Sequence, residues 1–360
     1  MFDNETAARV LRETPLSVSQ LRAYTKCPKS YELQYLTDPR YRSHGMGASV
    51  WFGALMQKII QHTYYDLPLY EAHIQVWQQE CPQVFDALEE WNHLDIAYRE
   101  SGNANTNARR DWLKEHSEYL ILGEQIAIYQ RQALGEWDWK KSYSLTGFYR
   151  WSSAFARKVP QEQVLLPHAV MVEGLPLYGP DGELMPLADD GSGRKSYRVL
   201  HGVFGIQSEV HVIGVPDEFG IDENGVAWIC DNKVSNAMLT PEQLEEDAQL
   251  ASYYLLLRQN EWIEPGQPTM VGHKYIQDGN VVPVWASISR YDDWVLPQLH
   301  EQFSALRMAR LSGTFPRVRG IQPWAFSPCK YCGVAYACLE HLATERKMVS
   351  QEDELVIADF

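Results

Sequence analysis

Asp217, Asp231 and Lys233 are the residues whose types and spacing best suit chemistry in this chain. Asp217 lies in the strand-like segment 208–221, and the other two lie in the strand-like segment 226–234. Because successive side chains of a strand alternate between faces, Asp231 and Lys233 point to the same face. If the two segments form a hairpin in the right register, three charged groups converge on one face of otherwise apolar strands.

The turn between these segments decides that register. If the loop is residues 223–225, with the glycine in the left-handed conformation, Asp222 faces Val226 and Asp217 faces Asp231. A loop of two residues would shift the register by one position and separate the two aspartates. We therefore predict two opposed carboxylates on the condition that the turn has three residues.

Two carboxylates side by side need a partner that offsets their repulsion. A hard cation such as Mg²⁺ or Mn²⁺, held by one or two carboxylates with water and phosphate oxygens, would supply it. Lys233 would then orient a water molecule and stabilise charge that develops on phosphorus. The spacing D-x-K also arises by chance, and Pro-Asp is a common turn signal, so an ordinary surface hairpin stays open at this point.

The elements that must position these residues alternate between helix and strand. Two helices separated by a break are expected in 16–36, an apolar helix in 45–66 and a largely helical region in 70–160. Residues 174–195 are rich in Gly, Pro and Asp and are expected to be irregular. A helix in 240–262, strands in 269–276 and 281–289, and a helix in about 291–311 follow.

Bulk composition limits the class of protein. The chain has 360 residues, no apolar run of membrane-spanning length and no recognisable signal peptide, so a cytoplasmic protein is expected. Its formal net charge of −15 argues against broad non-specific binding to nucleic acid, but a local basic groove remains compatible with it. The chain contains 12 Trp and 20 Tyr, which must fill a core or line a groove; we favour the core.

Three of the six cysteines form a cluster near the end of the chain. Cys329, Cys332 and Cys338 follow the spacing C-x2-C-x5-C, which suits a metal site but lacks the fourth ligand of a tetrahedral centre. Cys81 and Cys230 are expected to be ordinary buried cysteines.

Several motifs together resemble the PD-(D/E)XK nuclease superfamily in its RecB-like branch. These are "GVPD" (214–217), "DNK" (231–233) and "QLASY" (249–253). The segment 16–28, "LSVSQLRAYTKCP", resembles the beginning of that branch, and 329–338, "CKYCGVAYAC", resembles its iron–sulfur ending, as in CRISPR-adaptation and AddB-type nuclease domains. The resemblance implies an α/β, restriction-endonuclease-like core, with a central mixed sheet flanked by helices and a helical insertion.

The resemblance also implies a role for each motif residue. Asp217 and Asp231 would hold Mg²⁺ or Mn²⁺, Lys233 would act on water and the transition state, and Gln249 and Tyr253 would position phosphate or the lysine. The family often has a metal-binding His in the preceding helix, where this chain has Gln57; a weaker metal site follows. Cys27 would join Cys329, Cys332 and Cys338 around a [4Fe–4S] cluster, with a structural Zn²⁺ as the alternative.

The function implied is a metal-dependent DNA nuclease, acting as an exonuclease on single strands or free ends. The alternatives are a non-catalytic or weakly catalytic DNA-binding subunit of a helicase–nuclease or CRISPR-adaptation complex, and a structure-specific or RNA-directed endonuclease. The implied organisation is N-terminal helices (1–61), a helical insertion (62–170), the nuclease core (171–320), the cysteine segment (321–345) and an acidic tail (346–360).

Overall fold

The structure is a computed structural model that describes most of the chain. The described residues are 15–36, 48–64, 67–82, 85–101, 145–172, 188–189, 195–196, 200–204, 210–277 and 279–316, with single residues 108, 111, 115 and 338.

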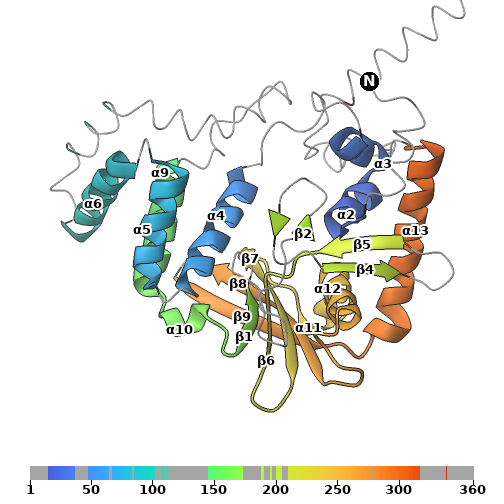
Figure 1. Cartoon of the computed structure of the whole chain (residues 1–360). Coiled ribbons are helices and arrows are strands. Elements are labelled where there is room, and N and C mark those ends of the chain that lie inside the picture. The colour runs from blue at the N-terminus through green and yellow to red at the C-terminus, as the bar shows by residue number, and fades with distance from the viewer. Residues whose placement is uncertain are drawn as a thin grey trace, which may run out of the picture.

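A mixed sheet of five strands, in the order β1-β6-β7-β8-β9, lies at the centre of the molecule (Figure 1). Strands β7 and β8 are parallel, and the other neighbouring strands are antiparallel. The mixed α/β architecture predicted from the sequence is therefore confirmed. The strands are β1 (Ala169–Val172), β6 (Glu218–Ile221), β7 (Ala227–Val234), β8 (Thr269–Gln277) and β9 (Asn280–Ser287).

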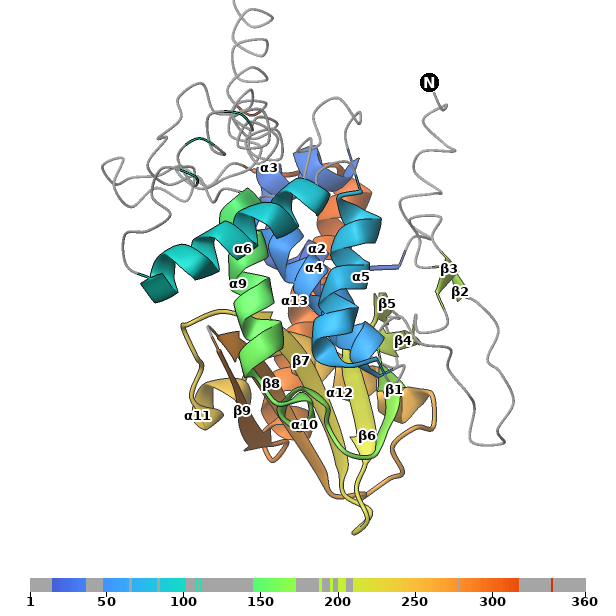
Figure 2. The same ribbon diagram turned by 90° about the vertical axis from the view of Figure 1, so that its left-hand side faces the viewer.

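The two faces of this sheet are covered by different groups of helices (Figure 2). Phe219, Ile229 and Val271 belong to one buried cluster, with residues of α2, α12 and α13. Ile276 and Val281 belong to the other, with residues of α4, α5 and α9. The helices are α2 (Val18–Lys26), α12 (Ala248–Gln259), α13 (Leu296–Ser312), α4 (Ala48–Thr63), α5 (Leu69–Glu80) and α9 (Leu145–Lys158).

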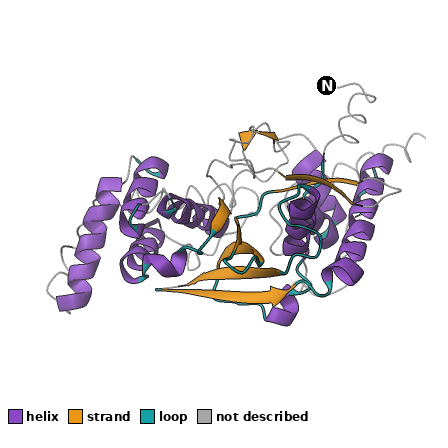
Figure 3. Cartoon of the chain, turned by 60° about the horizontal axis from the view of Figure 1, so that its bottom comes forward, coloured by secondary structure: helices purple, strands orange, loops and turns teal. Residues whose placement is uncertain are grey.

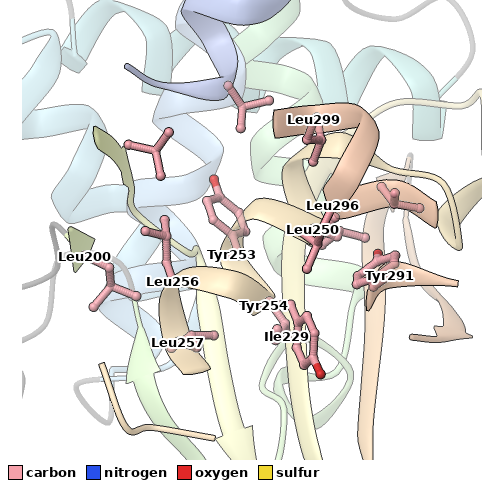
Figure 4. Close-up of a cluster of buried hydrophobic side chains, with 14 of the residues drawn as sticks. Leu200, Ile229, Leu250, Tyr253, Tyr254, Leu256, Leu257, Tyr291, Leu296 and Leu299 are labelled. Atoms are coloured by element: carbon pink, nitrogen blue, oxygen red, sulfur yellow. The ribbon is translucent and has the colours of Figure 1, made fainter. Parts of the chain in front are cut away.

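Helix α12 is held against the sheet by apolar side chains. Figure 4 shows Leu250, Tyr253 and Leu257 of this helix in a buried cluster that also contains Ile229 of β7 and Leu299 of α13. Each of the five is at most 7% exposed. This packing fixes the side of the helix that carries Gln249 relative to strand β7.

The segment 208–221 forms two strands, and the prediction of one continuous strand was wrong. Strand β5 (Val210–Gly214) pairs with β4 (Leu200–Phe204) in a separate two-stranded sheet, whereas β6 belongs to the central sheet. Pro216 lies in the break and has no N–H group for a ladder. The break leaves Asp217 immediately before β6.

The helix predicted over 240–262 is also divided. It forms α11 (Pro241–Leu244) and α12, with Asp247 as the N-cap of the second helix. Thr240 caps the first helix, with Pro241 at its first position.

The remaining elements complete the two helical layers and the second small hairpin (Figure 3). Part of the segment predicted to be irregular, 174–195, is described as strand. Of the two cysteines predicted to be buried, Cys230 is fully buried and Cys81 is half-buried. Among the described helices, none is both long and apolar enough to cross a membrane. The other elements are α3 (Pro28–Tyr31), a π-helix (Glu32–Leu36), α6 (Phe85–Ser101), α10 (Gln161–Val164), β2 (Ala188–Asp189), β3 (Lys195–Ser196) and a π-helix (Tyr291–Val295).

Candidate active site

The β6–β7 hairpin has the register predicted from its turn. The N–H of Asp222 donates to the carbonyl of Val226 at 2.9 Å, and Gly225 has a φ of +77°. The ladder continues as far as the pair Glu218 and Cys230. The next residue on each strand is an aspartate, Asp217 on one and Asp231 on the other. The three-residue loop predicted from the sequence is thus confirmed. The register that it sets, continued by one residue, places Asp217 opposite Asp231 just past the end of the ladder.

The turn is stabilised by its own side chain. Oδ1 of Asp222 accepts hydrogen bonds from the N–H groups of Asn224 and Val226, both at 2.8 Å. The bond from Val226 is the main reason that the pKa of the Asp222 carboxyl lies below its ordinary value. These bonds favour the loop with Gly225 in the left-handed conformation, which only glycine adopts without steric cost.

Asp217 is held where the ladder ends. Its Oδ2 accepts the backbone N–H of Asn232 at 2.8 Å, which joins it to the residue between Asp231 and Lys233. The side chain of Asp217 is half-buried, whereas Asp231 is 2% exposed. The two predicted metal ligands therefore lie at one end of neighbouring antiparallel strands.

Asp231 is contacted on both carboxylate oxygens. Gln249 donates from Nε2 to Oδ1 at 2.7 Å, and the ammonium group of Lys233 forms an ion pair with Oδ2. His273 of β8, directly beside Asp231 in the ladder, has its Nε2 3.8 Å from the same oxygen. Burial lowers the pKa of His273, so the ring is neutral at pH 7 and makes no ion pair there.

Gln249 connects the predicted site residues through both ends of its amide. Its Nε2 donates two hydrogen bonds of 2.7 Å each. One is to Asp231, and the other is to the hydroxyl of Tyr253, one turn further along α12. Its Oε1 accepts from Lys233 at 3.4 Å and from Arg22 at 2.9 Å. The structure thus brings together Asp231, Lys233, Gln249 and Tyr253.

Gln57 takes a different position from that group. Its Oε1 accepts from the side-chain amide of Asn232 at 2.9 Å. Asn232 alternates with Asp231 and Lys233 along β7, so this contact is on the opposite face of the strand. Gln57 is therefore linked to Asp217 through Asn232, whose backbone N–H holds that carboxylate.

Sequence reasoning missed a buried polar network on this second face. Glu218 accepts from Lys274 at 2.6 Å, from Asn232 at 2.7 Å and from the hydroxyl of Tyr64 at 2.8 Å. Burial, and then the neighbouring Glu218 charge, raise the pKa of Tyr64 well above its ordinary value. A lysine inside the apolar strand "TMVGHKYI" was the available signal, since a buried charge requires a partner.

Arg22 was also missed, although it contacts the site directly. Its guanidinium group reaches Gln249 and, at 3.4 Å, the carboxylate of Asp247. The resemblance-based motif "LSVSQLRAYTKCP" contains Arg22, but nothing in the sequence places it beside α12.

The predicted cysteine centre lies largely outside the described residues. Cys329 and Cys332 are not described; Cys27 and Cys338 are both half-buried. Cys27 lies between the two helices, as the C-cap of α2 and the N-cap of α3. The acidic tail 346–360 is also outside the described part of the chain.

The donor set fits a hard divalent cation. Asp217 and Asp231 supply carboxylate oxygens, and Oδ2 of Asp231 is buried and makes no hydrogen bond within the described part of the chain, although Lys233 lies against it. Among the residues that the structure describes, no group of three or more His, Cys, Asp and Glu side chains is arranged to hold a metal. One or two carboxylates completed by water and phosphate oxygens are the arrangement that Mg²⁺ commonly uses.

Comparisons with known proteins agree with this geometry. The family model described as the PD-(D/E)XK nuclease superfamily matches residues 15–339, which is most of the chain. The chain therefore belongs to the PD-(D/E)XK nuclease superfamily, and its five-stranded mixed sheet flanked by helices is consistent with a restriction-endonuclease-like fold. Nucleases of this superfamily act on DNA and generally use Mg²⁺ or Mn²⁺.

The other two comparisons add little. A search of curated proteins gives no match. Among solved structures, the crystal structure of SSO0001 aligns with 38% of this chain and 55% of its own chain, at 12% identity and a TM-score of 0.23. The aligned part spans little more than half of that protein, and a TM-score this low supports no conclusion about fold or function.

Proposed function

We propose that this protein is a Mg²⁺- or Mn²⁺-dependent deoxyribonuclease of the RecB-like branch, acting as an exonuclease on single-stranded DNA or free DNA ends. The observation that carries the proposal is the connected group formed by Asp231, Lys233 and Gln249, with Asp217 at the end of the neighbouring strand. Carboxylates that hold a cation, together with a lysine that donates to developing negative charge, suit phosphodiester hydrolysis.

Each residue has a distinct task in this proposal. Asp217 and Asp231 hold the cation, which when bound supplies Lewis-acid stabilisation of negative charge on the phosphate. Lys233, about a third exposed, orients the attacking water and donates to the phosphate oxygen on which charge develops. Gln249 keeps Lys233 and Asp231 in their relative positions, and Tyr253 supports Gln249 from the same helix face.

The test is degradation of end-labelled single-stranded DNA with Mg²⁺ or Mn²⁺, comparing wild type with Lys233→Ala. We expect the rate to fall by about 10³-fold, because a donor to the developing charge is lost. Lys58→Ala is the matched control, since Lys58 is an exposed lysine of α4 that pairs with Glu80. Equal cutting by wild type and Lys233→Ala would refute the assignment of the site. A linear and a circular substrate compared side by side would separate exonuclease from endonuclease activity, because an exonuclease needs a free end.

We propose further that Cys27, Cys329, Cys332 and Cys338 hold a [4Fe–4S] cluster that joins the two ends of the chain. The support is the resemblance of the cysteine motifs, together with the position of Cys27 at the junction of α2 and α3. Anaerobically purified protein should absorb broadly in the visible range and contain iron, and Cys27→Ser should lose both. A colourless protein that contains zinc would support the alternative, a structural Zn²⁺ site.

A second candidate function is that of a non-catalytic or weakly catalytic DNA-binding subunit of a helicase–nuclease or CRISPR-adaptation complex. One observation favours it: the Gln57 amide oxygen contacts Asn232 on the face of β7 opposite Asp231. Wild-type protein that binds DNA or a helicase, but cuts DNA with neither metal, would favour this function over the exonuclease.

A further inference from the structure

Arg22 of α2 is a half-exposed cation at the edge of the candidate active site. Its side chain is 50% exposed, and its Nη1 donates to Gln249 Oε1 at 2.9 Å. Lys233 donates to the same oxygen at 3.4 Å. Two cationic groups therefore lie side by side at a single amide oxygen, in a chain whose formal net charge is −15.

The carboxylate of Asp247 keeps Arg22 in this place. Nη2 of Arg22 lies 3.4 Å from Oδ2 of Asp247, while Oδ1 of Asp247 accepts the N–H groups of Gln249 and Leu250 at the start of α12. Asp247 is only 9% exposed and cannot turn away without uncapping the helix. The guanidinium group is thus fixed relative to the residue that contacts both Asp231 and Lys233.

The helix that carries Arg22 is itself anchored. Ser17 and Gln20 form a reciprocal cap at the start of α2. Buried Arg310 of α13 donates to Gln20 Oε1 at 3.0 Å and also bonds the hydroxyl of Tyr31. The backbone of Leu16 pairs with strand β5. Arg22 therefore projects from a helix whose first turn is tied to the core, and the helix that follows it, α3, is tied to α13 through Tyr31.

The chemistry of Arg22 suits a phosphate group. A guanidinium group has five N–H donors in a planar fork that matches phosphate oxygens. Within the part of the chain that the structure describes, hydrogen bonds engage only Nη1 and Nη2 of this fork. Exposure of half of the side chain leaves room for a further acceptor. A purely structural arginine would bury its fork among protein acceptors, as Arg310 does at 7% exposure.

We propose that Arg22 binds a backbone phosphate of single-stranded DNA beside the phosphate that is cut, and so contributes to DNA affinity. This inference rests on the proposed nuclease function of the neighbouring residues. Because the strand carries one phosphate per nucleotide, a cation adjacent to Lys233 is placed to meet the phosphate next to the one on which Lys233 acts.

The test is binding of a fluorescein-labelled oligothymidylate by full-length protein over a series of KCl concentrations. All proteins carry Lys233→Ala so that no cutting interferes, and Arg22→Ala, Arg22→Lys and Arg258→Ala are added one at a time. Arg258 is the matched control: it lies on α12, is 35% exposed and pairs with Asp292 at 2.8 Å. Thermal unfolding of each variant checks that it folds.

For Arg22→Ala we expect DNA affinity to fall by roughly five- to tenfold. The slope of log affinity against log salt should decrease in magnitude by about 0.7, the value for one phosphate contact on a single strand. Arg22→Lys should keep the slope, and Arg258→Ala should change neither quantity. An unchanged slope in Arg22→Ala, with or without weaker binding, would overturn the proposal, as would an equal change in Arg258→Ala or no DNA binding at all. An Arg22-dependent slope, together with a wild-type protein that cuts DNA with neither Mg²⁺ nor Mn²⁺, would support this inference while refuting the nuclease function.

Discussion

The Nζ atom of Lys274 lies 2.6 Å from Oε1 of Glu218, and both side chains are at most 1% exposed. Lys274 also donates to the carbonyl of Val164 at 2.6 Å, and Glu218 accepts from Asn232 and Tyr64. This fully bonded ion pair lies directly behind the site, because Glu218 follows Asp217 and Asn232 follows Asp231 in their strands. The network thus fixes the hairpin from the face opposite the carboxylates.

Removing one partner of this pair should destabilise the protein strongly. Lys274→Met is expected to lower the free energy of unfolding by about 3–5 kcal/mol, because it leaves the Glu218 carboxylate buried without its cation. Urea unfolding followed by fluorescence measures the change. The double variant Lys274→Met, Glu218→Gln should recover part of the loss, and a single variant as stable as wild type would contradict the importance of the pair.

Gln249 should matter more to turnover than Tyr253. Gln249→Leu removes the contacts with Asp231, Lys233 and Arg22, and we expect kcat to fall by about 10²-fold because the groups lose their relative orientation. Tyr253→Phe removes one acceptor of the Gln249 amide and should cost less than about tenfold. Steady-state cleavage of labelled DNA measures both. Equal losses in the two variants would mean that Tyr253 has a role of its own.

The register of the site could be predicted from the sequence because it depends on local chemistry. The Asp-Glu-Asn-Gly turn determines its own geometry through the Asp222 side chain and the positive φ of Gly225, and pairing then follows by counting residues. The break between β5 and β6 was missed because alternating apolar residues run through Pro216. Local pattern therefore identified strand-forming residues but not the sheet to which each strand belongs.

The contacts that complete the site join residues far apart in sequence. Arg22 and Gln249 are separated by 227 positions, and Glu218 and Lys274 by 56. No local pattern contains such a pair, since it results from how α2 packs on α12 and how β8 lies beside β7. The position of Gln57 is of the same kind: its place in α4 was predictable, but its contact with Asn232 depends on how the helix lies on the sheet.

Gln57 should influence metal affinity through Asn232. Gln57→Ala is expected to raise the Mn²⁺ concentration for half-maximal activity by roughly tenfold, because it removes an oxygen that is linked through Asn232 to Asp217. Gln61→Ala, one turn further along the same helix, is the matched control. Identical metal titrations for wild type and Gln57→Ala would restrict Gln57 to packing of the sheet.

His73 should make the stability of the helical layer depend on pH. This residue of α5 is fully buried, and its ring is bonded to the hydroxyl of Ser152 in α9 at 3.1 Å. Burial lowers its pKa from 6.5 to about 3. The unfolded chain therefore binds a proton below pH 6.5 that the folded chain does not. Stability is fully present above pH 6.5 and is lost as the pH falls toward 3, by ~1.4 kcal/mol per pH unit at most.

The comparison that isolates this effect is wild type against His73→Gln, which keeps a donor for the Ser152 hydroxyl. Urea unfolding from neutral pH down to about 5 should show a smaller loss of stability in the variant, because its side chain does not titrate. Carboxylates and the buried His273, whose pKa burial also lowers, contribute equally to both proteins and cancel. Parallel curves for the two proteins would show that His73 is protonated in the folded state as readily as in the unfolded chain.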